Sequence, residues 1–201
     1  MPMPKILLRD LDSRLVGAWT RRFSDCPDVE ASAGDIFAVR ADAIISPANS
    51  FGFMDGGIDR IYSKRFGWQL QDRLRELLAR EYDGELPVGL AVLLETGDPE
   101  IPYLISAPTM RAPVNVANTL NAYLAFRAAL RVAKRRNEEA PGSIASVMCP
   151  GLATATGEMD PEICAKQMYA AYVEVVLERH HRLGSVNDAI LEHYRLLRVE
   201  D

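Results

Sequence analysis

Cysteine and histidine are scarce in this sequence of 201 residues. Three of each occur, and no two cysteines have the CxxC spacing of a zinc-ligand pair. The odd cysteine count argues against a disulfide framework, so we expect a reducing, cytoplasmic environment and no bound metal. The histidines, His180, His181 and His193, all lie near the C-terminus. A Ser-His-Asp or Cys-His mechanism would therefore require the end of the chain to fold back onto a distant loop.

Long apolar runs and an excess of positive charge are also missing. No run approaches the roughly 20 residues of a membrane helix, and the N-terminus lacks a signal-peptide core, so no membrane partner is expected. The net charge is −5, which disfavours binding of duplex nucleic acid. The nucleotide signatures GxxxxGKS/T and GxGxxG are absent, and so is the GxSxG elbow of serine hydrolases. The common nucleotide-binding and hydrolase motifs therefore do not apply.

Strand-like and helix-like segments alternate along the chain. Short apolar runs predict strands at 5–9, 28–33, 43–46, 90–95, 103–106 and 144–148. Helical spacing predicts helices at 11–23, 58–66, 68–82, 118–136, 160–182 and 185–197. The alternation predicts an α/β fold, a three-layer α/β/α sandwich around a mixed, mostly parallel central sheet. We expect one domain over residues 1–201, with residues 185–201 as a helical appendage.

Two polar loops follow strand-like runs, and both are rich in small residues. The first spans 47–57 and the second spans 150–157. In open α/β sheets, ligands bind beyond the carboxyl ends of the strands. Backbone N–H groups at such loops and at helix N-termini bind anions. Together the two loops predict a site for a diphosphate and a sugar, with no cofactor required.

Four segments resemble the macro domain family in content and in order. They are Gly34-Asp35-Ile36, the DAIISPANS stretch at 42–50, the GGID stretch at 56–59, and PGLATATG at 150–157. The resemblance covers roughly residues 34–176. It implies the macro-domain α/β fold and a partner that is ADP-ribose or an ADP-ribosylated substrate.

The resemblance also implies roles for individual residues. Asp35 and Ile36 would contact adenine, and Asn49 would contact the distal ribose. Asp59 lies ten residues after Asn49, as does the acid implicated in hydrolysis in active family members, so Asn49 and Asp59 are the candidate catalytic pair. The backbone around the phosphates and the distal ribose would come from Gly56, Gly57, Ile58, Gly151, Ala153, Thr154, Ala155, Thr156 and Gly157.

Three positions depart from the family pattern. Ser46 stands where the family has the first asparagine of NAAN, and Asp55 replaces a glycine beside an expected anion. Tyr62 stands where a histidine often follows. These departures affect the prediction of catalysis more than the prediction of binding.

Each singled-out residue also has a structural alternative. Asp35 is a common type of turn or cap residue, and Asn49 tolerates left-handed turns. Asp59 in the first turn of a helix is favoured by the helix dipole without any catalytic role. Arg111, in an unusual segment after a strand, either faces a phosphate or belongs to an ordinary surface loop.

Two functions of different classes follow from the sequence. The first is hydrolysis of an ADP-ribosyl ester, O-acetyl-ADP-ribose or ADP-ribose 1″-phosphate, with Asp59 orienting or deprotonating a water molecule. The second is a non-catalytic ADP-ribose reader that uses the same loops. A module for another nucleotide, or for nucleic-acid ends, is a third and weaker hypothesis. The oligomeric state does not follow from the sequence.

Overall fold

The computed structural model describes residues 3–181 and 183–199. Its strands are β1 (Lys5–Asp10), β2 (Val29–Ala33), β3 (Ala43–Ser46), β4 (Val92–Glu95), β5 (Tyr103–Ser106) and β6 (Ser146–Cys149). Its helices are α1 (Ser13–Arg22), α2 (Gly57–Phe66), α3 (Gln69–Glu81), α4 (Asn121–Glu139), α5 (Pro161–Val175) and α6 (Val186–Arg195), with a 3₁₀ turn, η1, at Ile36–Ala38.

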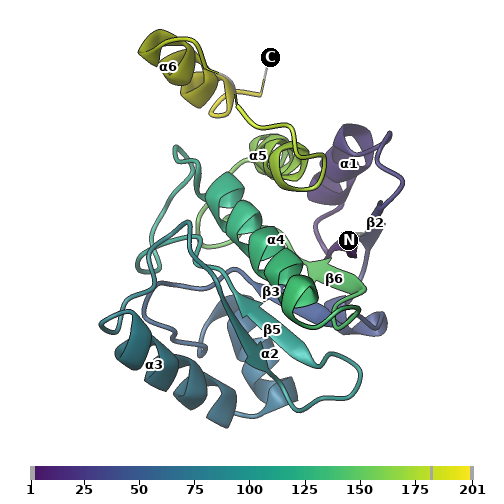
Figure 1. Ribbon diagram of the computed structural model, residues 1–201, viewed down its shortest axis with the longest axis vertical. Helices are drawn as coiled ribbons and strands as arrows, with labels where there is room; N and C mark the ends of the chain where they lie inside the picture. Colours follow the sequence, from purple (N-terminus) through teal and green to yellow (C-terminus); the bar gives the residue numbers. More distant parts are fainter. Residues whose placement is uncertain (1–2, 182, 200–201) are drawn as a thin grey trace.

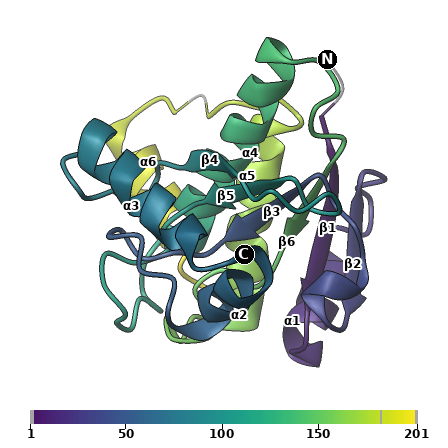
Figure 2. The ribbon, with the colours of Figure 1, turned by 90° about the horizontal axis from the view of Figure 1, so that it is seen from below.

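The strands form one six-stranded sheet in the order β2-β1-β6-β3-β5-β4. Every neighbouring pair is parallel except β4 with β5. Helices α1, α4 and α5 cover one face of the sheet, and α2 and α3 cover the other (Figures 1 and 2). The predicted three-layer α/β/α sandwich with a mixed, mostly parallel sheet is confirmed.

The central strands are apolar on both faces because both faces are covered by helices. Their side chains alternate between two cores, as the period of two in a strand requires. Ile45 and Val147 face the core of α1, α4 and α5, whereas Ile44 and Met148 face the core of α2 and α3. This is why short apolar runs such as Ala43–Ser46 predicted strands correctly.

Parallel strands bring their carboxyl ends to one edge of the sheet. Strand β1 ends at Asp10, β3 at Ser46 and β6 at Cys149, and these three strands are neighbours in the sheet. The two polar loops follow β3 and β6 directly. The topology therefore places both loops side by side, as the sequence analysis expected.

Helix α5 begins as predicted but ends earlier than expected. Asp160 caps it by accepting from the backbone nitrogen of Glu162 at 2.8 Å, with Pro161 in the first turn. The helix was predicted to continue to Arg182, which lies outside the described residues. It ends at Val175, because Glu178 adopts a left-handed conformation with φ of 53°. The apolar residues that follow Val175 continue the helical pattern, which explains the error.

Helix α4 begins at Asn121, three residues later than predicted. The preceding segment is held in a turn, where the Thr119 hydroxyl donates to the carbonyl of Val116 at 2.7 Å. Side-chain bonds of this kind compete with helix formation.

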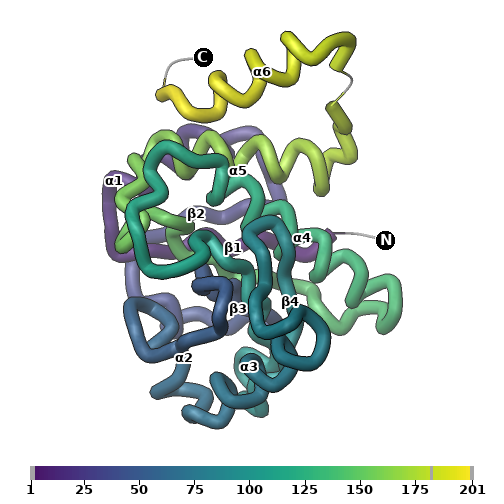
Figure 3. The backbone as a smooth tube through the Cα atoms, turned by 90° about the vertical axis from the view of Figure 1, so that its left-hand side faces the viewer, coloured from purple at the N-terminus to yellow at the C-terminus, as the bar shows by residue number. Residues whose placement is uncertain are grey.

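Helix α6 lies beyond α5, on the outer side of the layer formed by α1, α4 and α5 (Figure 3). None of its residues is buried. The chain returns to α5 just after it, where Leu196 is buried and its carbonyl accepts from Gln167 Nε2 at 3.2 Å. No helix within the described residues is both long and apolar enough to cross a membrane.

Candidate functional site

A cleft of about 640 Å³ lies at the carboxyl ends of β1, β3 and β6. The loops after β3 and β6 form two of its walls, and the segment that leaves β5 forms a third. The residues that line it are Asp10, Asp12, Pro47, Ala48, Asn49, Phe51, Phe53, Asp55, Gly56, Gly57, Ile58, Asp59, Thr109, Met110, Ala112, Pro113, Pro150, Gly151, Ala153, Thr154, Ala155, Thr156 and Gly157.

The side chain of Asn49 shapes the first loop. Its Oδ1 accepts from the backbone nitrogens of Phe51 and Phe53 at 3.1 and 3.3 Å, and its Nδ2 donates to the Phe53 carbonyl at 2.8 Å. These bonds close a tight turn in which Gly52 has a φ of 70°. Asn49 therefore organises its own loop while it also lines the cleft.

The first loop leads into the N-terminus of α2 at the cleft. Gly57 has a φ of 51°, a conformation that favours glycine, and a Cβ there would meet only open space. The helix has Gly56 as its N-cap and no side-chain cap. In the described part of the chain, no protein acceptor takes a bond from the backbone N–H groups of the five residues 55–59. A helix start with free donors is a ready anion site.

The second loop is folded back on itself over 153–159. Glu158 and Met159 donate to the carbonyls of Ala155 and Ala153, both at 3.0 Å. A Cβ at Gly157 would collide with the Ala153 carbonyl, so only glycine fits this turn. The backbone N–H groups of the six residues 152–157 likewise find no acceptor among residues 3–181 and 183–199. The residues of both runs line the cleft, except Leu152, which is buried in the core.

Among the described residues, no lysine, arginine or histidine lines the cleft, and the charged side chains that line it are all aspartates. An anion in this cleft would therefore be bound by backbone N–H groups and not by cationic side chains. This arrangement suits a group such as a diphosphate, whose oxygens can accept several N–H bonds at once.

Asp59 is the buried acid of the site. It is 6% exposed, and Ser46 Oγ donates to its Oδ1 at 2.6 Å. Burial raises the pKa of the Asp59 carboxyl to about 7, while the hydrogen bond from Ser46 opposes this rise. A group with a pKa near neutrality exchanges protons readily, as a general acid or base must.

The position of Ser46 explains one departure from the family pattern. Ser46 ends β3 and is fully buried, so its hydroxyl is held against the Asp59 carboxyl at the base of the cleft. Tyr62, which stands at another departure, is buried in the core and donates to the carbonyl of Ile45 at 3.2 Å. Both side chains are buried and bonded within the protein, so neither Ser46 nor Tyr62 extends into the cleft to contact a ligand.

The structure brings most of the predicted site residues together. Ten of the twelve line the cleft, namely Asn49, Gly56, Gly57, Ile58, Gly151, Ala153, Thr154, Ala155, Thr156 and Gly157, and the candidate catalytic residue Asp59 joins them.

Asp35 and Ile36 do not line the cleft. Asp35 caps η1 by accepting from the backbone nitrogen of Phe37 at 3.0 Å, and Ile36 is 8% exposed. They follow β2, the strand next to β1. The preceding residue, Gly34, donates at 3.0 Å to the carbonyl of Asp10, and Asp10 lines the cleft. The exposed Asp35 carboxylate is therefore close to the cleft and outside its lining.

Asp10 and Asp12 line the cleft but were not among the predicted site residues. Asp10 accepts from the backbone nitrogens of Gly151 and Asp12 at 2.9 and 3.0 Å, which ties the second loop to the end of β1. Asp10 directly follows the strand predicted at 5–9, and Asp12 lies two residues further on, in the segment predicted as a helix. The rule that ligands bind at carboxyl ends of strands would have indicated them.

Arg111 does not line the cleft, although its neighbours Met110 and Ala112 do. Its guanidinium forms a two-bond pair with Glu85, at 2.7 and 2.9 Å, and lies over the ring of Phe51. Of the two alternatives, the surface-loop role describes Arg111 in this structure.

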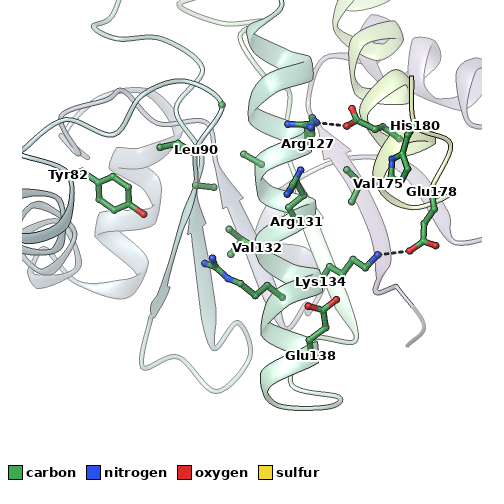
Figure 4. Close-up of a pocket in the computed structure, with 15 residues that line it drawn as sticks. Tyr82, Leu90, Arg127, Arg131, Val132, Lys134, Glu138, Val175, Glu178 and His180 are labelled. Atoms are coloured by element: carbon green, nitrogen blue, oxygen red, sulfur yellow. Dashed lines mark hydrogen bonds and ion pairs between the residues drawn. The ribbon is translucent and has the colours of Figure 1, made fainter. Parts of the chain in front are cut away.

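A larger cavity of about 810 Å³ lies over α4, on a different part of the molecule (Figure 4). Arg127 and Lys134 of α4 form ion pairs across it with Glu174 and Glu178, at 2.8 and 2.5 Å. We call this cavity the α4 groove. Four of its charged side chains are paired in this way, so we rank it below the smaller cleft as a candidate ligand site.

No group of metal-ligating side chains that could hold a metal ion occurs in the portion of the chain that is described.

Comparisons with known proteins match the part of the chain that contains both loops of the cleft. A sequence model of the Macro domain family matches residues 45–168. An uncharacterised protein of Aquifex aeolicus is 32% identical over 141 residues, which cover 70% of this chain and 78% of that protein.

Solved structures show the same fold. The macrodomain of Mycobacterium tuberculosis DarG aligns with a TM-score of 0.60 at 22% identity, over 71% of this chain and 88% of that one. The Oceanobacillus iheyensis macrodomain with ADP gives 0.59 at 19% identity, over 82% and 88%. Thermosipho africanus DarTG in complex with ADP-ribose gives 0.57 at 16% identity, over 72% and 37%.

Proposed function

Because the chain belongs to the macro domain family, we propose that its cleft binds ADP-ribose or an ADP-ribosylated substrate. The observation that carries this proposal is the pair of backbone runs, 55–59 and 153–157, whose residues line one cleft and whose N–H groups find no acceptor among the described residues. Ten such donors on two facing loops suit the oxygens of a diphosphate. The solved relative in complex with ADP-ribose supports the choice of ligand.

The two ends of the ligand would meet different groups. Asp35 has one carboxylate oxygen that accepts from Phe37, which leaves the other for the adenine amino group, with Ile36 beside it. The distal ribose would lie between Asn49 and the start of α2, where Gly56, Gly57 and Ile58 present their backbone. The second loop, from Gly151 to Gly157, would cover the diphosphate.

We further propose that the protein hydrolyses an ADP-ribosyl ester or a related bond, with Asp59 as the general base. A buried carboxyl with a pKa of about 7 lies at the distal-ribose end of this proposed pose, held in place by Ser46. It would remove a proton from the attacking water. The backbone donors would position the substrate and stabilise charge that develops in the transition state.

A non-catalytic reader is the second candidate, and one observation favours it. Both polar atoms of the Asn49 amide already bond to its own loop. An asparagine committed in this way has little capacity left to orient a water molecule or a reacting hydroxyl. Binding would then occur without turnover.

The test is titration calorimetry with ADP-ribose, with AMP and NAD as controls. We expect a Kd of roughly micromolar order for ADP-ribose and weaker binding of AMP, which lacks the second phosphate and the distal ribose. Absence of ADP-ribose binding would overturn the proposal. Incubation with O-acetyl-ADP-ribose and with ADP-ribosylated peptide then separates hydrolase from reader, because only a hydrolase releases ADP-ribose.

A further inference from the structure

The side chains that line the cleft carry negative charge and no positive charge within the described residues. The charged side chains that line it within the described residues are the carboxyl groups of Asp10, Asp12, Asp55 and Asp59, and no lysine, arginine or histidine of residues 3–181 and 183–199 lines it with them. A ligand with several negative charges thus meets neutral donors from the described lining, namely backbone N–H groups and hydroxyls such as those of Thr154 and Thr156.

Two of these acids have structural partners. Asp10 accepts the backbone nitrogens of Gly151 and Asp12. Asp12 caps α1 through the backbone nitrogen of Arg14 at 2.9 Å and pairs with the Arg14 guanidinium at 3.2 Å. The positive charge of Arg14 offsets the negative charge of Asp12. Asp10 and Asp12 therefore act mainly to hold the second loop and the start of α1 in place.

The other two acids flank the start of α2. Asp55 is exposed, directly precedes Gly56, and forms no hydrogen bond or ion pair within the described residues. Asp59 lies two residues after Gly57, and within the described residues its carboxyl accepts a hydrogen bond from Ser46 only. The backbone donors that would meet the distal part of the ligand are thus bracketed by carboxyl groups.

We propose that this cleft selects ADP-ribosyl substrates whose distal ribose carries an uncharged or cationic group, and rejects a phosphomonoester at that position. The inference rests on the proposed function, and it narrows the three substrate types to the esters and O-acetyl-ADP-ribose. A phosphate adds a charge of about −1.5 to −2, which Asp55 repels. The two arginines beside this loop, Arg75 and Arg111, lie over the rings of Phe53 and Phe51 and outside the lining of the cleft. Asp55 is the residue that determines this specificity.

The experiment compares ADP-ribose with ADP-ribose 1″-phosphate by titration calorimetry at low salt, with phosphate release measured alongside. We expect ADP-ribose to bind at least about tenfold more tightly, with no phosphate released. The gap should narrow at high salt, since the repulsion from an exposed carboxylate is screened.

The Asp55→Asn variant tests the residue itself. The quantity to compare is the Kd for ADP-ribose 1″-phosphate divided by the Kd for ADP-ribose. In Asp55→Asn this ratio should be at least about threefold lower than in the wild type. Asp72→Asn is the matched control, because it removes an exposed carboxylate from α3, outside the lining of the cleft, and should leave the ratio unchanged.

The outcomes are distinct. Equal or tighter binding of the 1″-phosphate by the wild type, or release of phosphate, overturns the proposed specificity while ADP-ribose binding stands. An unchanged ratio in Asp55→Asn overturns the role of that residue. Failure of the wild type to bind ADP-ribose overturns the proposed function, and the specificity with it.

Discussion

The cleft and the α4 groove enclose similar amounts of open space, about 640 and about 810 Å³, but different polar groups face it. In the groove, cationic and anionic side chains from α4 and the end of α5 pair with each other across the surface (Figure 4). In the cleft, backbone donors that find no acceptor among the described residues lie beside acids at the start of α2. The size of a cavity therefore does not identify a site, whereas the pairing of its polar groups does.

The largest effect is expected at Asp59. If the protein is a hydrolase, Asp59→Ala should lower turnover by about 10²- to 10⁴-fold, because the general base is removed. In the wild type the rate should rise with pH through about 7 and then level, since the base acts when ionised and burial raises its pKa to about 7. Release of ADP-ribose from O-acetyl-ADP-ribose measures both.

The Ser46→Ala variant serves as the control for this assignment. The hydrogen bond from Ser46 lowers the pKa of Asp59, so its loss should move the pH profile to higher pH without abolishing turnover. Unaltered turnover in Asp59→Ala would show that Asp59 is not the base.

The next largest effect should come from Gly57→Val. A side chain at this position would enter open space at the cleft, and valine does not readily adopt a φ of 51°. We expect on the order of 100-fold weaker binding of ADP-ribose, or about 2.7 kcal/mol. Titration calorimetry measures the binding, and thermal unfolding measures the cost to the fold.

Gly142→Val is the matched control, because Gly142 also has a positive φ of 80° and open surroundings but lies in the turn after α4. It should lose stability to a similar extent and keep its affinity. Equal affinity in both variants would exclude the start of α2 as part of the ADP-ribose site.

The sequence predicted the layers and the two loops more reliably than the contacts made between them. Strands at 43–46 and 103–106 were predicted with their correct bounds, because buried strands between two helical layers are short apolar runs. The end of α5 could not be predicted, since Val176 and Leu177 continue its apolar pattern. The bond from Ser46 to Asp59 joins residues on different elements, and only the packing of α2 against β3 brings them together.

A smaller effect is expected at Asp35, which lies beside the cleft and not in its lining. Asp35→Ala should weaken ADP-ribose binding by about 1.5–3 kcal/mol, roughly 10- to 100-fold, through loss of a charge-assisted hydrogen bond to adenine. The same change removes the cap of η1, so stability must be measured as well.

Asp160→Ala removes a comparable cap, at the start of α5, from a residue that does not line the cleft. It should therefore cost stability without a change in affinity. Unchanged affinity in Asp35→Ala would show that Asp35 does not recognise adenine and only caps η1.

The smallest effect on binding is expected in the α4 groove. Glu174 is 9% exposed, and it accepts from the Tyr123 hydroxyl and from Arg127 Nε at 2.5 and 2.8 Å. Arg127→Ala would leave this carboxylate with fewer partners and should lower the free energy of unfolding by about 1–3 kcal/mol. Arg80→Ala, which removes an exposed pair with Glu81, should change it by less than about 1 kcal/mol.

Neither arginine variant should alter the Kd for ADP-ribose, because the groove and the cleft share no lining residue. Urea unfolding and titration calorimetry on the same protein preparations check the two statements separately. A severalfold change in the Kd of Arg127→Ala alone would mean that the groove and the cleft are coupled through α4 and α5. The two cavities would then not be independent, and the ion pairs of the groove would belong to the groups that determine the shape of the cleft.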